Sequence, residues 1–157
     1  MITITPMTRE LLHMFYRHFV PDPDILEDRD SCDPYIYDAD AVDREFEENA
    51  AEPGRMEFAV LLDGEVIGSV GLKHVDREQK DCELMIHLTN DFVKNRGYGT
   101  EAERLMIRYA FEELGMDTVL ADCLHKNSRS KHVLEKLGFQ YLREDDRFRY
   151  YRLDRAE

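Results

Sequence analysis

The amino-acid sequence predicts a mixed α/β fold in which a central sheet of about six or seven strands is flanked by about four helices. Two observations support this prediction. Two helical patterns come first and are followed by alternating apolar and polar residues, which are typical of strands. Strands and helices then alternate to the end of the sequence, an order that places helices against a mixed sheet. We expect one domain over residues 1–157, because this length and a hydrophobic fraction of 43% suffice for one core.

The first third of the chain predicts one short strand and two helices. Residues 2–5 alternate like a strand, and Pro6 is expected to open a helix that runs to about residue 20. The PDPD sequence at residues 21–24 ends this helix, and a second helix is expected over about residues 40–51. The residues expected to share one face of the first helix are Leu11, Met14, Phe15 and His18.

The middle of the chain predicts three strands that follow one another. MEFAVLL at residues 56–62 and EVIGSVGLKHV at residues 65–75 flank an Asp-Gly pair, which accepts the positive φ of a tight hairpin turn. CELMIHLT at residues 82–89 predicts a third strand. These three segments therefore form the centre of the expected sheet.

The last third of the chain alternates between helices and strands. An amphipathic helix is expected from about residue 98 to residue 114, where Gly115 would end it. TVLADCL at residues 118–124 predicts a buried strand, and NSRSKHVLEKLG at residues 127–138 predicts a shorter helix. FQYLRE and RFRYYRLDR then predict a closing pair of strands.

Charge and composition exclude several classes of protein. A net charge of −13 argues against binding to nucleic acid or to an anionic membrane, because both need a cationic surface. No stretch resembles a signal peptide or reaches the roughly 18 apolar residues of a membrane span. Cys32, Cys82 and Cys123 lack metal-ligand spacing, so we expect no metal, and reduced thiols in a cytoplasmic protein. The acidic residues concentrate between Pro21 and Glu52, either as a solvated surface or as a field that attracts an amine or a cationic peptide.

The most informative segment is KNRGYGT at residues 94–100, between a predicted strand and the long helix. The start of a helix offers unpaired backbone N–H groups and the positive end of the helix dipole, which suit a bound phosphate. Gly97 and Gly99 remove the Cβ atoms that would keep a diphosphate from these amides, and Lys94 and Arg96 add positive charge. The spacing fits neither a P-loop, which needs GK[ST], nor the dinucleotide-binding GxGxxG.

This segment resembles motif A of the GNAT superfamily of N-acetyltransferases, Q/R-x-x-G-x-G/A, and NSRSKHVLEKLGF at residues 127–139 resembles its motif B. The likeness covers residues 56–154 well and the N-terminal third only in outline. It is greatest to the branch that contains the ribosomal-protein alanine acetyltransferases. The resemblance implies the GNAT fold, with a mostly antiparallel mixed sheet. It also implies acetyl transfer from acetyl-CoA to a primary amine of a small molecule or of a protein N-terminus.

The resemblance further implies which residues bind the coenzyme. Leu88 and Thr89, at the end of a strand, would pair their backbone with the pantetheine arm. Asn127 would form a hydrogen bond to the pantetheine region, and Ser130 would lie close to the thioester sulfur. The residues whose amides would surround the diphosphate, beside the charges of Lys94 and Arg96, are Asn95, Gly97, Tyr98, Gly99 and Thr100.

The reaction needs a base for the attacking amine and a proton source for the leaving thiolate. Many members of the family provide a tyrosine for the second role, but Leu134 stands at that position here, and Ser130 one turn earlier is the substitute. Glu83 and His87 share one face of the predicted strand 82–89 and are alternative bases. For His87 a packing role remains the alternative, and for Ser130 a hydrogen bond to the helix backbone.

Other hypotheses stay open at this stage. Leu134 keeps open a GNAT-fold module that binds acyl-CoA without turnover, and an interaction domain without coenzyme is the third class. Coenzyme A binding separates the third class from the others, and thiol release separates the first two. The expected partners are acetyl-CoA and an amine, with a homodimer also open. Tyr35 and Tyr37 are expected either to line the acceptor pocket or to pack a loop onto the core.

Overall fold

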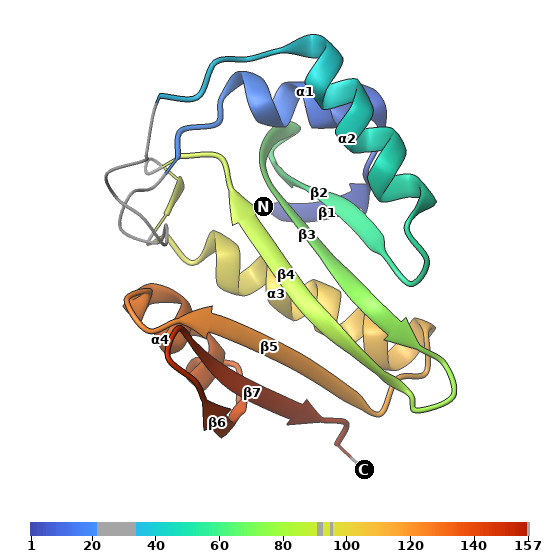
Figure 1. Ribbon diagram of the computed structural model, residues 1–157, viewed down its shortest axis with the longest axis vertical. Coiled ribbons are helices and arrows are strands. Elements are labelled where there is room, and N and C mark those ends of the chain that lie inside the picture. Colours follow the sequence, from blue (N-terminus) through green and yellow to red (C-terminus); the bar gives the residue numbers. More distant parts are fainter. Residues whose placement is uncertain (22–33, 91–92, 95, 157) are drawn as a thin grey trace.

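The computed structural model describes residues 1–21, 34–90, 93–94 and 96–156. Within these residues it contains a seven-stranded sheet and four α-helices (Figure 1). The strand order is β1-β2-β3-β4-β5-β7-β6, and the β4–β5 pair is parallel whereas the other neighbouring pairs are antiparallel. The mixed sheet with flanking helices that the sequence predicts is therefore confirmed.

The elements follow the predicted order along the chain. None of the helices in the described ranges is long and apolar enough to cross a membrane. The elements are β1 (Ile2–Pro6), α1 (Arg9–Arg17), α2 (Ala39–Ala51), β2 (Met56–Leu62), β3 (Glu65–Asp76), β4 (Asp81–Leu88), α3 (Tyr98–Arg108), the π-helical turn η3 (Tyr109–Glu113), β5 (Thr118–Leu124), α4 (Ser128–Lys136), β6 (Gln140–Glu144) and β7 (Phe148–Asp154).

The N-terminal helix begins later than the sequence predicts. Pro6 does not open it, because Pro6 is the last residue of β1 and pairs with Phe58 of β2. Helix α1 starts at Arg9, where the Thr8 hydroxyl accepts a hydrogen bond from the Leu11 N–H at 3.2 Å. The capping residue, and not the proline, therefore sets the beginning of this helix.

The buried face of α1 also differs from the prediction. Leu12 and Phe15 are its buried residues, whereas Met14 is 43% exposed and His18 is exposed at the end of the helix. The predicted face that included Met14 and His18 was wrong because it was placed about one residue off around the helix. Only Phe15 keeps its expected buried position.

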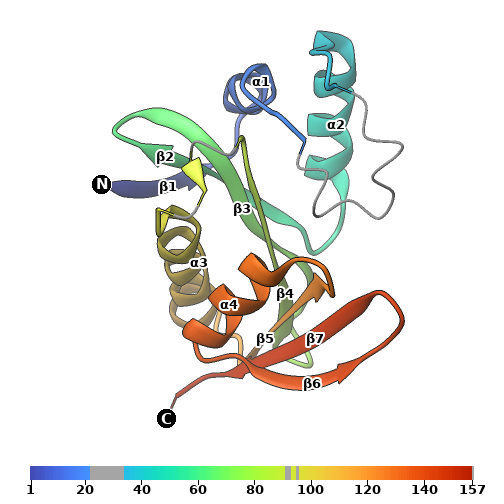
Figure 2. The same ribbon diagram turned by 90° about the vertical axis from the view of Figure 1, so that its left-hand side faces the viewer.

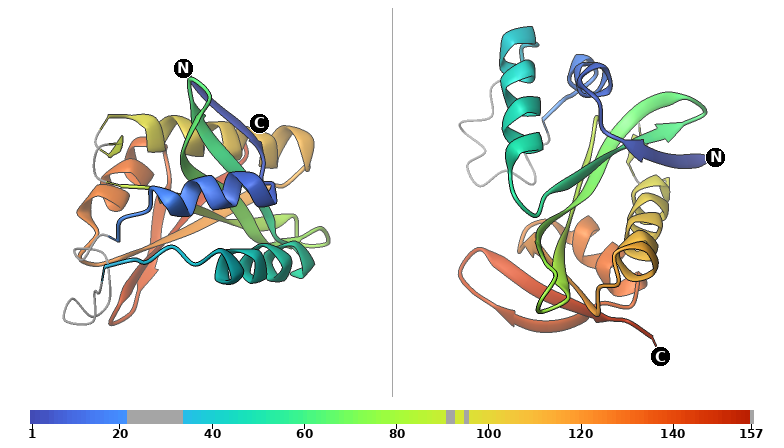
Figure 3. Two further views of the ribbon diagram at one scale, coloured as in Figure 1. Left: turned by 90° about the horizontal axis from the view of Figure 1, so that it is seen from above. Right: turned by 90° about the vertical axis from the view of Figure 1, so that its right-hand side faces the viewer.

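The helices lie in two layers on opposite faces of the sheet (Figures 2 and 3). Helices α1 and α2 cover one face, and α3 and α4 cover the other. Even-numbered side chains of β3 and β4, such as Leu72 and Leu84, form the main core with Met106 of α3. The odd-numbered side chains Glu83 and His87 consequently face the α1–α2 layer.

The two buried cysteines belong to this core. Cys82 is 1% exposed and Cys123 is 5% exposed, and both are free thiols. Burial, the main cause, raises the pKa of the Cys82 thiol to about 12. These residues therefore act as small packing residues at neutral pH. Cys32 lies outside the described residues.

The sheet divides between β4 and β5. Their parallel ladder joins only Asp81–Glu83 to Thr118–Leu120. Beyond it β4 remains paired with β3, and β5 remains paired with β7, so the two halves of the sheet spread apart (Figure 1). The start of α3 lies beside the end of β4, since a Cβ atom on Gly99 would be 3.7 Å from the side chains of Ile86 and Leu88.

Glu103 places a carboxyl group in the core. It lies on α3, is 4% exposed, and its Oε2 has no hydrogen-bond partner among the described residues. Burial raises its pKa from 4.5 to about 8. At pH values between 4.5 and about 8, Glu103 keeps its proton in the folded protein but has lost it in the unfolded chain. The free energy of unfolding therefore falls as the pH rises through this range.

We expect Glu103→Leu to raise the free energy of unfolding, by on the order of 2 kcal/mol at pH 8, because no buried carboxyl group then has to stay protonated or become charged. The gain over the wild type should be smaller at about pH 5. Urea unfolding at the two pH values measures this difference, with the exposed Glu112→Gln as the control. A gain that is equal at both pH values would contradict the proton linkage.

Candidate active site

The start of α3 presents backbone donors with no competing side chain. Gly97 is the N-terminal cap, with a φ of 81° in the left-handed region that favours glycine. The first N–H bonded within the helix is that of Glu101, which donates to the Gly97 carbonyl at 3.1 Å. The N–H groups of Tyr98, Gly99 and Thr100 therefore have no acceptor inside the helix, and the helix dipole favours an anion beside them.

The two glycines of this turn have different surroundings. A Cβ atom on Gly97 would meet no atom within 4 Å, so this side of the turn is open. A Cβ atom on Gly99 would point toward β4, where it would contact Ile86 and Leu88. The two glycines thus differ in surroundings, since Gly97 faces open space and a Cβ atom on Gly99 would be in ordinary contact with β4; that both clear space for a diphosphate stays a prediction.

The structure describes the two basic residues that were predicted at this turn, but not Asn95 between them. Arg96 is exposed next to Gly97, and Lys94 is half-buried. Asn95 lies outside the described residues, so its predicted amide contact is not described. Arg96 thus places a positively charged, exposed residue directly before Gly97.

At the end of β4, the backbone of Leu88 faces the edge of the strand that β5 leaves unpaired. The Thr89 N–H donates to Ile67 at 2.9 Å, and its carbonyl accepts from the Val20 N–H at 2.7 Å. Backbone groups alternate between the two edges of a strand, so those of Leu88 point away from β3 toward the space left by β5. Of the two residues predicted to pair with a pantetheine arm, Leu88 is therefore the better oriented.

The start of α4 gives Asn127 a capping role. Its Oδ1 accepts a hydrogen bond from the Ser130 N–H at 3.1 Å. A contact with pantetheine would consequently fall to its Nδ2 group. Ser130 is half-buried in the first turn of α4, and Leu134 one turn later is 2% exposed within the core. Position 134 therefore offers no proton to a leaving group.

Glu83 and His87 lie on one face of β4, as their spacing predicts. They are four residues apart, which is roughly 13 Å along a strand, so they cannot both contact one reacting atom. Glu83 lies in the short β4–β5 ladder, and its carboxylate contacts His74 Nδ1 at 2.7 Å and Lys73 Nζ at 3.9 Å. His87 lies on the part of β4 beyond this ladder.

His87 is exposed, so the alternative of a packed histidine does not hold. Surrounding protein nevertheless desolvates the ring, and this lowers the pKa of the imidazole. Glu57 opposes the shift, while Arg55 and Lys73 act in the same direction as desolvation. The ring is therefore mostly neutral at pH 7 and able to accept a proton.

A polar network next to His87 ties α2 to the sheet. Glu57 of β2 accepts a hydrogen bond from the Ser69 hydroxyl at 2.9 Å and another from Asn49 of α2 at 3.2 Å. Ser69 is the cross-strand neighbour of His87. The network therefore fixes the position of α2 relative to the separated end of β4.

The aromatic residues of the α1–α2 layer pack against one another. Tyr35 stacks on Tyr16 at a centroid distance of 5.3 Å and contacts the edge of Phe19 at 5.4 Å. The Tyr16 hydroxyl donates to Glu45 at 2.8 Å, and burial together with this bond raises the pKa of Tyr16. Tyr37 bonds to a histidine of α1. Tyr35 and Tyr37 therefore both contact α1 or its end, and a place in the acceptor pocket stays a prediction.

Asp122 is a candidate functional residue that the sequence analysis missed. It lies on β5, on the same face of the sheet as Glu83, and desolvation, together with the nearby Glu83 carboxyl group, raises the pKa of Asp122. The signal was present in TVLADCL, because alternation places Asp122 on the face opposite the buried Val119, Ala121 and Cys123. What the sequence lacks is the register that brings β5 beside β4.

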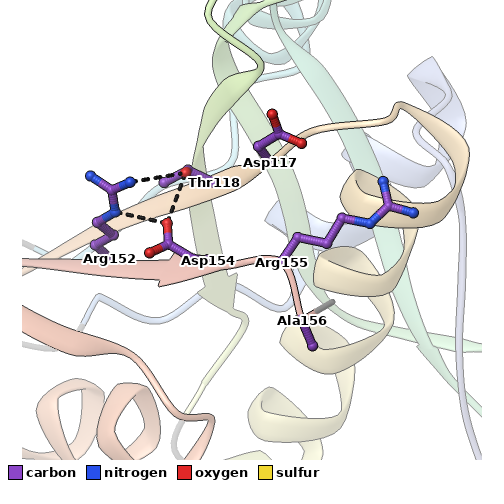
Figure 4. Close-up of a pocket in the computed structure, with 6 residues that line it drawn as sticks. All are labelled: Asp117, Thr118, Arg152, Asp154, Arg155 and Ala156. Carbon is purple, nitrogen blue, oxygen red and sulfur yellow. Dashed lines mark hydrogen bonds and ion pairs between the residues drawn. The ribbon is translucent and has the colours of Figure 1, made fainter.

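A surface pocket lies at the opposite end of β5 from the start of α4. Six residues line it, and the Asp154 carboxylate accepts hydrogen bonds from Thr118 at 2.9 Å and from Arg152 at 2.7 Å (Figure 4). The Thr118 bond joins β5 to β7, and the Arg152 bond lies within β7. In the described ranges, no three His, Cys, Asp or Glu side chains form a candidate metal site.

Comparison with known proteins gives one family and several relatives. The model of the acetyltransferase (GNAT) domain family matches residues 2–140. YdaF of Bacillus subtilis, provisionally named a ribosomal N-acetyltransferase, is 32% identical over 89 residues, which are 57% of this chain and 48% of YdaF. YjcK of the same organism, provisionally named an N-acetyltransferase, is 30% identical over 97 residues, which are 60% of this chain and 54% of YjcK. The chain thus spans about half the length of these curated relatives.

Solved structures share the fold over almost the whole chain. A protein of T. thermophilus, provisionally described as an acetyltransferase, has a TM-score of 0.77 and 27% identity, covering 98% of this chain and 85% of its own. The N-acetyltransferase PseH of Campylobacter jejuni, solved in complex with acetyl coenzyme A, has a TM-score of 0.75 and 18% identity. The match to PseH covers 99% of this chain and 100% of that one, and at this identity it is a likeness of fold.

The capping bond of Asn127 predicts a specific effect on stability. We expect Asn127→Ala to lower the free energy of unfolding by about 1 kcal/mol, because an N–H at the start of α4 loses its acceptor. Asn127→Ser, which keeps a capping oxygen, should recover most of the loss. Urea unfolding measures both, and equal losses for the two variants would show that the cap contributes little.

Proposed function

The chain belongs to the GNAT acetyltransferase family, and from this premise we propose that it transfers an acetyl group from acetyl-CoA directly to a primary amine of a small molecule or of a peptide N-terminus. The family expected from the two sequence motifs is thereby confirmed. The single observation that carries the proposal is the start of α3. There three backbone N–H groups without acceptors in the helix adjoin an open glycine turn and the separated end of β4.

The coenzyme fits this arrangement on chemical grounds. A diphosphate takes up hydrogen bonds from the N–H groups of Tyr98, Gly99 and Thr100, and charge-assisted bonds of this kind contribute about 1.5–3 kcal/mol each. Arg96 adds charge beside them. The backbone of Leu88 then offers a strand edge along which the amide groups of a pantetheine arm can pair. Such a path leads the thioester toward the place where β4 and β5 meet.

We assign proton removal to Glu83. The amine nitrogen attacks the thioester carbonyl, the N–C bond forms, and the C–S bond breaks with its electron pair on sulfur. The proton lost by nitrogen goes to the Glu83 carboxylate, directly or through water. His87 is the alternative base, favoured by its neutral ring, but it lies farther from the β4–β5 ladder toward which the arm would point.

We assign protonation of the leaving thiolate to the Ser130 hydroxyl, in exchange with solvent. Leu134 favours a second candidate function, a module that binds acetyl-CoA without turnover, because its buried side chain replaces the tyrosine that many relatives use. Release of thiol from acetyl-CoA in the presence of a panel of primary amines separates the two candidates. Turnover supports the enzyme, and binding without turnover supports the module.

The acceptor is expected on the α1–α2 side of the sheet. That side of the sheet carries Glu45 of α2 and Glu57 of β2, and the chain as a whole is strongly acidic, so the field favours an amine that arrives as an ammonium ion. The acceptor must release that proton before it attacks. The pair of tyrosines at positions 16 and 35 adds an aromatic surface of the kind that contacts cations.

Gly97→Val should weaken the binding of coenzyme A by tenfold or more, because the new side chain fills the open side of the turn and disfavours its positive φ. Isothermal calorimetry with coenzyme A measures the change. Gly115→Val is a matched control, since Gly115 also has a positive φ, of 70°, and no atom within 4 Å, but lies at the far end of the helix. Equal binding by the two variants would place the coenzyme elsewhere.

Ser130→Ala should lower kcat while leaving the KM for acetyl-CoA nearly unchanged, because the hydroxyl acts on the leaving thiolate and not in binding. Steady-state thiol release with a saturating amine separates the two constants. Ser128→Ala, at an exposed position of the same turn, is the control. An unchanged kcat would remove Ser130 from the reaction.

A further inference from the structure

We propose that His74 is a positioning residue for acetyl transfer, whose imidazole N–H holds one oxygen of the Glu83 carboxylate so that the other oxygen is in place to take a proton from the acceptor amine. This inference rests on the proposed function, in which Glu83 is the base. It adds a residue of β3 to a reaction centre whose assigned residues lie on β4 and α4.

An irregularity in the β3–β4 ladder brings His74 onto the face of Glu83. The ladder is regular as far as the pair of Lys73 and Glu83, and it resumes at the pair of Asp76 and Asp81. Between these pairs two residues of β3 therefore stand opposite one residue of β4, which is the pattern of a β-bulge. A bulge interrupts the alternation of side chains, so that His74 follows Lys73 onto the same face of the sheet.

The backbone of this bulge has a conformation that few side chains adopt. His74 has a φ of 52°, in the left-handed region that favours glycine. The next residue, Val75, packs against the core, and its N–H donates to the Gly54 carbonyl at 3.0 Å. These two contacts of Val75 hold the bulge in place. The side chain of His74 is thereby turned away from the core and toward Glu83.

The redirected side chain ends in a hydrogen bond to the Glu83 carboxylate. His74 Nδ1 lies 2.7 Å from Glu83 Oε2. An ionised carboxylate only accepts hydrogen bonds, so Nδ1 carries the hydrogen whether the ring is neutral or charged. Lys73 Nζ lies 3.9 Å from the other oxygen, Oε1. One oxygen of Glu83 is therefore held by a direct bond, and the other keeps lone pairs for the amine proton.

Stability does not account for this arrangement. The His74 side chain is 73% exposed, and a polar contact so open to solvent contributes little to the stability of a fold. A backbone conformation that most residues avoid thus accompanies a contact that stabilises the domain only slightly. Conformations of this kind gather at functional sites, and the partner of His74 is the carboxylate to which proton removal is assigned.

The hydrogen bond has a direct use in the reaction. It fixes the plane of the Glu83 carboxylate, because an N–H that bonds to one oxygen restricts rotation of the whole group. When the amine nitrogen attacks the thioester carbonyl, its proton goes to the other oxygen of Glu83. Glu83 then releases this proton to solvent and returns to its starting state. His74 keeps its own hydrogen throughout and need not touch the acceptor.

Two substitutions of His74 separate the donor from the backbone conformation. Asparagine places an amide N–H as many bonds from the backbone as Nδ1 and accepts a positive φ, so His74→Asn should keep kcat within about twofold of the wild type. His74→Gly also accepts this φ but has no donor, and should lower kcat by about tenfold with an unchanged KM for acetyl-CoA. Steady-state thiol release measures both variants, and equal kcat values for the two would overturn the proposal.

Lys80→Gly is a matched control for the backbone. Lys80 is exposed in the turn of the same hairpin and has a φ of 56°, so glycine relaxes its conformation without removing a contact of Glu83. Its kcat should equal that of the wild type. A loss as large as that of His74→Gly would show that a looser hairpin, and not the missing donor, lowers the rate, and would contradict the role of His74.

A double-mutant cycle tests whether His74 acts through Glu83. In the Glu83→Gln background, His74→Gly should cause no further loss of kcat, because the carboxylate that His74 positions is gone. A second loss of about tenfold in this background would show that His74 acts elsewhere. A structural role would lower kcat in both backgrounds alike, so the cycle distinguishes it from positioning.

The outcomes separate this inference from the proposed function. An enzyme whose kcat depends on Glu83 but not on His74 would overturn this inference alone. A kcat that Glu83→Gln leaves unchanged would overturn the assignment of Glu83 as the base, together with the role of His74. A wild type that binds coenzyme A but releases no thiol with any amine would overturn the proposed function and the positioning role with it.

Discussion

The parallel ladder between β4 and β5 is the constraint from which the arrangement of the site follows. It joins three residues of each strand, and it is the point where the β1–β4 half of the sheet meets the β5–β7 half. Parallel neighbours need a long crossover connection, here through α3, and that helix necessarily starts where β4 ends. A longer ladder would close the sheet over the edge of β4 that Leu88 presents. A shorter one would separate Glu83 from β5, to which it is joined at Leu120.

The two faces of the sheet have separate tasks as a consequence. The α3–α4 face contains the main core and the helix start that suits a diphosphate, so its residues are constrained by packing as well as by binding. The α1–α2 face carries the titratable groups of β4 and β5. In the proposed reaction, the acetyl donor and the amine meet where the two halves of the sheet part, because elsewhere the strands are hydrogen-bonded to each other.

Features that depend on a single helix, strand or turn could be predicted from the local sequence. The hairpin turn, the order of the elements and the glycine turn before α3 all follow from short-range rules, and the structure contains them. The start of α1 was not predicted correctly. Pro6 belongs to β1, and the helix begins after Thr8, which provides the N-terminal cap. The surroundings of Gly99 could not be predicted either, because Ile86 and Leu88 come near it only after α3 has packed on β4.

Residues that depend on register were the hardest to predict. Glu83 could be placed on the same face as His87 from spacing alone, but nothing in the sequence aligns residue 83 with residue 120 across a parallel pair. The sequence alone therefore could not show that Asp122 lies on the same face of the sheet as Glu83. Asn127 had the opposite difficulty, since the family motif suggested a ligand contact while its own position before a helix already explained a capping role.

The attachment of the α1–α2 layer has a consequence for how such proteins diverge. Leu12, Phe15 and Val42 are the buried residues of these two helices, and the helices are joined at the surface by an ion pair of Arg9 and Asp43 at 2.9 Å. Bonds between exposed charged groups contribute little to the stability of the whole domain. If this layer binds the acceptor, as proposed, substitutions on its surface can change acceptor choice without disturbing the core or the start of α3.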